Sequence, residues 1–309
     1  MMAVYVTGHK NPDTDSVTAA IAYAELLKAQ GTDAIASMQG ELNPKTQAVL
    51  RRFNVPAPEI MKDAAGKTVA LVDHSDLKQA PDNLSADNVV AIVDHHKIGD
   101  VTTNSPIFCY VKPVGCTGTV LKQLYDVEGV AIQPKIAGLM MSAILSDTVN
   151  FKSPTCTEED KKAVAELKTI AAVQDTDALF MEMLKAKSAI DGIPAMDLLN
   201  RDYKDFDMKG KTVGCGQLEL AALDQATPAI REALYKAMQE KKAAGGQHTV
   251  LLMLTDVVKE GTELMVLSDD ASMIEGAFNT KMSGNSMWIP GMMSRKKQTI
   301  PNLQKAFGC

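Results

Sequence analysis

Short apolar runs alternate with helical patterns over the first half of the chain. Residues 4–7, 68–72 and 89–93 are continuous apolar runs rich in β-branched residues, which is typical of parallel strands buried on both faces. Apolar residues at helical spacing lie between and after these runs. We predict helices at 17–28, 44–53, 117–125, 134–145 and 158–173. Strands that alternate with helices indicate an α/β domain with a doubly wound, mainly parallel sheet and helices on both of its faces.

The pattern loosens at residues 189–195, where Gly192 and Pro194 interrupt it. We place a linker there, between a first domain at 1–188 and a smaller α/β domain at 196–309. The length of 309 residues is consistent with two domains of ordinary size. The smaller domain is predicted to contain strands at 212–215, 249–254 and 264–267 and helices at 228–241 and 273–278.

The composition is that of an ordinary globular protein, with 46% hydrophobic and 23% charged residues. The net charge of -6 argues against a nucleic-acid partner, which would require a basic surface. We find no apolar stretch long enough to cross a bilayer and no signal-peptide pattern. The five cysteines form no CxxC pair, which favours reduced thiols. These features predict a cytoplasmic protein with no membrane partner.

Acidic and imidazole side chains follow three of the predicted strands. In an open α/β sheet the carboxyl ends of the strands converge on one side, where ligands bind. So many carboxylates cannot be ionised together without a cation, and a mixed His and Asp set suits Mn²⁺, Co²⁺, Fe²⁺ or Zn²⁺ better than Ca²⁺. The set is large enough for two metals, a common arrangement in phosphoryl hydrolysis. It consists of His9, Asp13 and Asp15 after the first strand, Asp73 and His74 after the second, Asp94, His95 and His96 after the third, and Asp147 after a predicted helix.

Each of these motifs also has a plainer interpretation. Residues 9–15 are consistent with a turn and a helix cap, and Asp and Ser are common after strands, as at 73–75. Two adjacent imidazoles at 95–96 are harder to explain by packing. Because all three motifs occur at strand ends, the metal site is favoured over the plainer interpretations.

A basic segment, Ser-Arg-Lys-Lys-Gln at 294–298, lies near the C-terminus. Such a run is usually a solvated loop, but Arg and Lys also suit phosphate binding, and Lys204 is a further candidate. The small residues at 114–119 precede a predicted helix, which is consistent with phosphate binding at the helix N-terminus and equally with an ordinary capped helix. We interpret Cys116, within this segment, as structural.

Taken together, the motifs resemble those of the family II, manganese-dependent inorganic pyrophosphatases of the DHH phosphoesterase superfamily. The resemblance covers essentially the whole chain, and Ser75 stands where we expect Asn in many members. It implies a homodimer through the N-terminal domain and an active site in the cleft between the two domains. The matching segments are GHKNPDTDS (8–16), DHS (73–75), DHH (94–96), PVGCTGT (113–119), SDTVNFKSPTCT (146–157) and SRKKQ (294–298).

The resemblance implies hydrolysis of inorganic pyrophosphate to two orthophosphates by a hydroxide activated by two metals. The implied cofactors are two Mn²⁺ per subunit, with Co²⁺ as an alternative, and Mg²⁺ that arrives with the substrate. The alternative activity is that of another DHH phosphoesterase acting on polyphosphate or short oligonucleotides, which the low aromatic content of 5% disfavours. A non-enzymatic relative is disfavoured because every ligand position is occupied by a suitable residue.

The resemblance also implies a role for each candidate residue. His9, Asp13 and Asp73 would hold one metal, and Asp15, Asp73, His95 and Asp147 the other, with Asp73 bridging. His96 and Asp73 would be catalytic, His96, Lys204, Arg295 and Lys296 would bind the phosphates, and His74 and Asp94 would orient the ligands.

Overall fold

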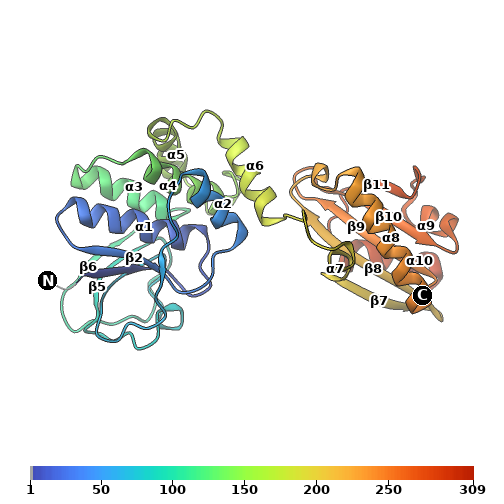
Figure 1. Cartoon of the computed structure of the whole chain (residues 1–309), viewed down its shortest axis with the longest axis horizontal. Helices are drawn as coiled ribbons and strands as arrows, with labels where there is room; N and C mark the ends of the chain where they lie inside the picture. The colour runs from blue at the N-terminus through green and yellow to red at the C-terminus, as the bar shows by residue number, and fades with distance from the viewer. Residues whose placement is uncertain (1–2) are drawn as a thin grey trace. The chain divides into compact units, whose positions relative to one another are not determined.

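The computed structural model describes residues 3–309, which form two compact units divided between Lys187 and Ser188 (Figure 1). The division falls just before the linker that the sequence predicts at 189–195. Ile190, inside that predicted linker, belongs to the hydrophobic core of the second unit. Among the described residues, no helix combines the length and the apolar character needed to span a membrane.

Unit 1 contains a six-stranded parallel sheet in the order β3-β2-β1-β4-β5-β6. Chain order reverses between β1 and β4, and in such sheets ligands bind at the carboxyl ends of the strands beside this switch point. The two strands that flank the switch point end directly before candidate ligands. The strands are β1 (Val4–Thr7), β2 (Ala34–Met38), β3 (Glu59–Ile60), β4 (Thr68–Val72), β5 (Val89–Asp94) and β6 (Phe108–Val111).

The helices of unit 1 pack against one face of this sheet (Figure 1). Val6, Ala70 and Val72 point from the strands into this helical core. α1 begins three residues earlier than predicted, because Asp13 caps it by accepting a hydrogen bond from the Ser16 N–H at 2.9 Å. The helices are α1 (Thr14–Ala29), α2 (Pro44–Arg52), α3 (Thr117–Glu128), α4 (Pro134–Asp147), α5 (Glu158–Ile170) and α6 (Thr176–Lys187).

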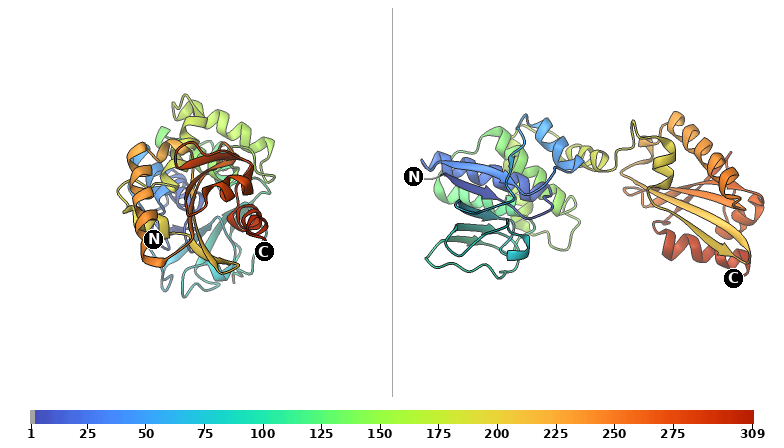
Figure 2. Two further views of the ribbon diagram at one scale, coloured as in Figure 1. Left: turned by 90° about the vertical axis from the view of Figure 1, so that its right-hand side faces the viewer. Right: turned by 60° about the horizontal axis from the view of Figure 1, so that its bottom comes forward.

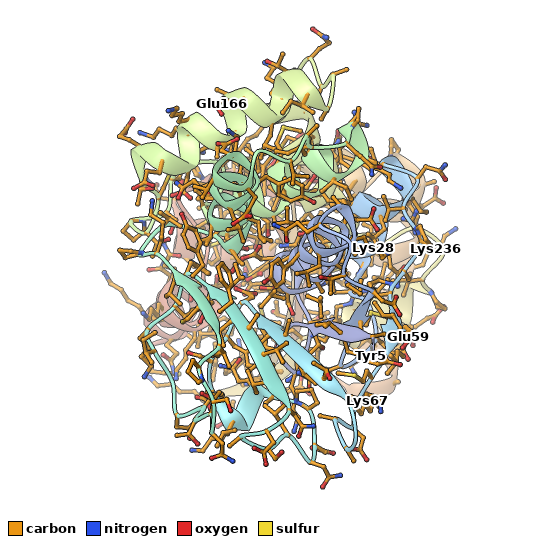
Figure 3. The ribbon with its side chains drawn as sticks, turned by 90° about the vertical axis from the view of Figure 1, so that its left-hand side faces the viewer. Tyr5, Lys28, Glu59, Lys67, Glu166 and Lys236 are labelled. Atoms are coloured by element: carbon orange, nitrogen blue, oxygen red, sulfur yellow. The ribbon has the colours of Figure 1, made fainter. Side chains whose placement is uncertain are left out.

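The opposite face of the sheet is covered by connecting segments. Leu71 and Ile92 pack there against Met61. At its rim the ammonium group of Lys67 lies 5.8 Å from the ring centre of Tyr5 (Figure 3). Helices were expected on this face as well, but the connections from β3 to β4, from β4 to β5 and from β5 to β6 contain no α-helix, only the 3₁₀ turn η1 (Leu77–Gln79).

Unit 2 contains a five-stranded mixed sheet in the order β11-β10-β9-β8-β7, in which β8 and β9 are parallel and the other pairs antiparallel. α8 and α10 lie on opposite faces of the sheet (Figure 2), so that alternate residues of β9 pack on each. The strands are β7 (Tyr203–Met208), β8 (Lys211–Leu220), β9 (Thr249–Asp256), β10 (Gly261–Ser268) and β11 (Ser286–Pro290). The helices are α7 (Ala195–Asn200), α8 (Pro228–Gly245), α9 (Ala271–Phe278) and α10 (Ile300–Phe307), with the short turns η2 (Leu223–Gln225) and η3 (Arg295–Thr299).

Candidate functional site

The carboxylate of Asp73 lies at the centre of the candidate site. Asp73 follows β4 directly in a left-handed backbone conformation (φ 63°), and its side chain is 2% exposed. The Nε2 atom of His9 lies 3.3 Å from Oδ2, and the Nε2 atom of His95 lies 3.4 Å from Oδ1. The Nδ1 atom of His96 lies 3.6 Å from Oδ1, and the Thr117 hydroxyl donates to Oδ1 at 3.0 Å. One buried carboxylate therefore contacts three imidazoles from two different strand ends.

The second part of the site forms where α1 meets the N-terminus of α3. Asp15, fully buried in the first turn of α1, accepts hydrogen bonds from the backbone N–H groups of Thr117 at 2.7 Å and Gly118 at 3.1 Å. The positive end of a helix stabilises a carboxylate in this position. The Nε2 atom of His95 lies 3.9 Å from Asp15, which links this part to Asp73.

Ligand atoms of these side chains form three groups, within each of which all atoms lie within 4.8 Å of one another. Unit 1 thus brings together every metal-ligand candidate of the sequence, and Asp73 belongs to two of the groups. The third group also contains Cys116, which the sequence analysis interprets as structural. The groups are His9 with Asp13 and Asp73, Asp73 with His95 and His96, and Asp15 with Cys116 and Asp147.

Two further candidates lie directly behind these ligands. The Asp94 carboxylate accepts hydrogen bonds from the backbone N–H groups of His95 and His96, at 2.7 and 3.0 Å, and contacts the His96 Nδ1 atom at 2.9 Å. His74 is buried, its Nδ1 atom lies 3.1 Å from the Val72 carbonyl oxygen, and its ring meets that of His9 edge to face. Both residues therefore lie against the candidate ligands, and their role in orienting the ligands stays a prediction.

Burial and charge crowding perturb the pKa values of this cluster. Burial and the nearby Asp73 and Asp13 carboxylates raise the pKa of Asp15 to about 7. Burial and the nearby Asp13 and Asp73 carboxylates also raise the pKa of Asp147 well above its usual range. Burial would lower the pKa values of the two central imidazoles, but the Asp73 carboxylate raises them to about 9 for His9 and about 10 for His95. The crowded carboxylates thus favour positive charge within the cluster. A divalent cation bound by carboxylates and neutral imidazoles would supply that charge.

The basic candidates of unit 2 gather around the edge pair β7–β8. The guanidinium of Arg295 is buried and donates to the Asp202 carboxylate at 2.6 Å, to the Asp202 carbonyl oxygen, and to the Cys215 carbonyl oxygen at 3.1 Å. Lys204 pairs with Cys215 in the β7–β8 ladder and is exposed, as is Lys296. Arg295 therefore lies beside the strand that carries Lys204.

Two residues that hold Arg295 in place are not predicted from the sequence. Asp202 pairs with Arg295, and Gln217 accepts a hydrogen bond from the Arg295 backbone N–H at 3.3 Å while donating to the Met293 carbonyl at 3.0 Å. Neither belongs to a motif, because each is a single polar residue whose partner lies about 80 to 90 positions away in the chain. Only the folded chain reveals them.

The fold and the Asp–His cluster define a class of DHH-type, metal-binding two-domain proteins. Residues 3–144 match the model of the DHH family, N-terminal domain, and residues 181–306 match the model of the DHHA2 domain. Both halves of the chain therefore belong to known domain families.

Full-length relatives narrow this class. The chain is 51% identical to a protein of Archaeoglobus fulgidus described as a probable manganese-dependent inorganic pyrophosphatase, with 98% of each chain covered. It is 42% identical to the manganese-dependent inorganic pyrophosphatase of Methanocaldococcus jannaschii, covering 98% of this chain and 99% of that one. A crystal structure of a Methanococcus jannaschii protein described as a putative family II inorganic pyrophosphatase matches with a TM-score of 0.59 and 41% identity, covering 99% of this chain and all of that one. The chain belongs to the manganese-dependent, family II inorganic pyrophosphatases.

Proposed function

We propose that the protein hydrolyses inorganic pyrophosphate to two orthophosphates, using two divalent cations bound by unit 1. The observation on which this rests most heavily is the position of Asp73, whose carboxylate is shared by two groups of potential ligands. A shared carboxylate is a common feature of two-metal phosphoryl hydrolases. The names of the full-length relatives support pyrophosphate as the substrate.

In this proposal His9, Asp13 and Asp73 hold one cation, and Asp15, Asp73, His95 and Asp147 hold the other. When bound, the two ions would lower the pKa of a water molecule, which supplies the nucleophile, and would offset the charge of the phosphates. Mn²⁺ suits this mixture of carboxylates and imidazoles, Co²⁺ is the alternative, and Mg²⁺ would accompany the substrate. The Cys116 thiol beside Asp15 and Asp147 does not exclude either of these borderline ions.

His96 is the proposed proton donor to the leaving phosphate. Its side chain is 52% exposed, so it is accessible to a substrate, and its Nδ1 atom is held by Asp94 at 2.9 Å. Contact with the Asp94 carboxylate raises the pKa of His96, which favours the protonated form near neutral pH. A protonated imidazole held in one orientation is suited to general acid catalysis.

The phosphates are proposed to bind to Lys204, Arg295 and Lys296 of unit 2. Arg295 is pre-positioned by Asp202 and the Cys215 carbonyl, and the two lysines are exposed beside it. In phosphoryl transfer, positioning and charge neutralisation supply most of the catalysis. A cytoplasmic homodimer that associates through unit 1 completes the proposal, on the family resemblance alone.

The proposal is tested by phosphate release from pyrophosphate and tripolyphosphate, and by mononucleotide release from a dinucleotide, with Mn²⁺ and Mg²⁺ supplied. We expect pyrophosphate to be hydrolysed fastest and the dinucleotide not at all. Faster release from tripolyphosphate or the dinucleotide would favour the alternative of another DHH phosphoesterase. No release from pyrophosphate with both metals present would refute the proposal.

A further inference from the structure

The first turn of α2 lies against the loop that carries two of the acidic ligands. Asn43 caps α2 by accepting from the Thr46 N–H at 2.9 Å, and its amide donates to the Pro12 carbonyl at 3.4 Å. The buried Thr46 hydroxyl lies 3.0 Å from that of Thr14. Pro12 and Thr14 flank Asp13 in the chain, so these contacts fix the start of α2 beside this acid.

Lys45, in the same turn of α2, reaches from this loop to the end of α4. Its ammonium group donates to the Ser146 hydroxyl at 2.5 Å, directly before Asp147 in the chain. The side chain is partly buried, and burial lowers the pKa of Lys45 against the attraction of Asp147 and Asp13. A positive charge is therefore held next to the acids of the metal centre.

The charge of the centre gives this lysine a role that Ser146 alone does not explain. Five carboxylates surround the site, and their charge offsets that of two divalent cations and the proposed His96 imidazolium, so these groups together present no net positive charge to an incoming anion. The ammonium group of Lys45 adds one positive charge beside them. An ammonium group has three donors, and within residues 3–309, which the structure describes, Lys45 makes one hydrogen bond, to the Ser146 hydroxyl. The carboxylates are those of Asp13, Asp15, Asp73, Asp94 and Asp147.

We propose that Lys45 is a further substrate-binding residue, whose ammonium group binds a phosphate oxygen of pyrophosphate, or of the orthophosphate product, at the metal centre. This inference rests on the proposed function. It adds a cation from unit 1 to the three phosphate-binding residues proposed in unit 2. It also makes an unusual prediction for the metals, because the ammonium group repels cations while it attracts the substrate.

Replacement of Lys45 by Met therefore has opposite effects on the two ligands. Removing a positive charge several ångström from a cation in partly solvated protein changes affinity on the order of tenfold. We expect Lys45→Met to bind Mn²⁺ more tightly, by about threefold to tenfold, and orthophosphate more weakly. The KM for pyrophosphate should rise on the order of tenfold, with a smaller change in kcat.

The competing role is that of an anchor, in which Lys45 only holds Ser146 and hence Asp147 in place. In that case Lys45→Met would loosen a ligand, so Mn²⁺ affinity would fall and the KM would change little. The sign of the change in Mn²⁺ affinity therefore separates the two roles. Lys45→Gln, which keeps a hydrogen-bond donor without the charge, serves as a second neutral variant.

The experiment measures Mn²⁺ and orthophosphate binding to the full chain by titration calorimetry, together with pyrophosphate kinetics. Lys45→Arg should retain wild-type behaviour, and Arg51→Met, which removes one exposed charge from the same helix, is the matched control. Weaker Mn²⁺ binding, or unchanged Mn²⁺ and orthophosphate binding in both neutral variants, would overturn the inference. If the wild-type protein does not hydrolyse pyrophosphate, the proposed function fails, whereas the two binding measurements still decide the role of Lys45.

Discussion

Replacing Asp73 by Asn removes the negative charge around which three imidazoles gather. The amide retains the size of the side chain, and Asn adopts the left-handed conformation of this position (φ 63°) readily, so the turn after β4 should persist. The substitution removes the anionic partner of His9 and His95, whose Nε2 atoms lie 3.3 and 3.4 Å from the carboxylate. The perturbation is therefore electrostatic, in an almost unchanged shape.

The pKa values of the two imidazoles give the magnitude. In the metal-free protein they are about 9 for His9 and about 10 for His95, because contact with Asp73 overcomes the effect of burial. Without that carboxylate we expect both to fall to near 6.5 or below. A fall from about 9 to 6.5 corresponds to roughly 3 kcal/mol of lost interaction with the imidazolium.

The same shifts fix the sign of a pH effect on stability. Because the folded-state pKa values lie above the ordinary 6.5, the two ion pairs stabilise the metal-free protein fully below pH 6.5. This contribution to the free energy of unfolding is lost as the pH rises through about 9 and about 10. Asp73→Asn should lack this alkaline loss, and it should also fail to bind Mn²⁺ at either position.

Histidine ring proton shifts, followed by NMR in the metal-free protein from about pH 5 to about pH 11, measure both pKa values directly. Asp94→Asn is the control, because Asp94 contacts the ring of His96 and not that of His95, so it should leave His9 and His95 unchanged. If His9 and His95 still titrate near pH 9 and 10 in Asp73→Asn, the assignment of their shifts to Asp73 is wrong.

Three further predictions concern the metals and the basic group. Thr117→Val deletes the hydroxyl that donates to Asp73 but keeps the backbone hydrogen bond to Asp15. It should weaken Mn²⁺ binding by about tenfold in calorimetry, whereas Thr117→Ser should not. Equal Mn²⁺ affinities of the two variants would contradict this prediction. Arg295→Ala should lower turnover on the order of 100-fold while Mn²⁺ affinity stays the same, and loss of the metals would refute that division of roles. Mn²⁺ affinity should rise as the pH increases toward about 9, because the metal displaces protons from His9 and His95; an affinity independent of pH would exclude protonated imidazoles in the metal-free site.

The buried strands of unit 1 are predictable from the sequence because their burial is encoded locally. β1 (VYVT) and β4 (TVALV) are runs rich in β-branched residues, and each begins and ends where its run does. β2, with the sequence AIASM, and the two-residue β3 lack such a signal and become strands by pairing with neighbours. The same holds for β6, which is added at the opposite edge of the sheet.

In unit 2 the central strand β9 and the helix α8 are predictable, since each has a long apolar run or a clear helical period. The edge strands β7 and β11 are not, because an edge strand is half exposed and its sequence alternates weakly. Local pattern therefore identifies the core elements, and the sheet edges depend on the assembled fold.

The acids and imidazoles of the candidate site are already conspicuous in the sequence. A parallel sheet places the ends of neighbouring strands side by side, so motifs that follow strands are expected to converge. The structure brings His9, Asp73 and His95 together in this way. The order of the strands, which puts β1 next to β4, is not encoded in any one segment.

The sequence alone thus determined which residue types line the site and that they follow strands, because periodicity and motif spacing are local properties. The tertiary structure decided which groups touch: Thr117 on Asp73, Cys116 beside Asp15, Lys45 on Ser146 and Asp202 on Arg295. These partners are 30 or more positions apart, and each is an ordinary residue in its own segment. Their pairing follows from how helices and strands pack, which depends on long-range contacts that no local pattern specifies.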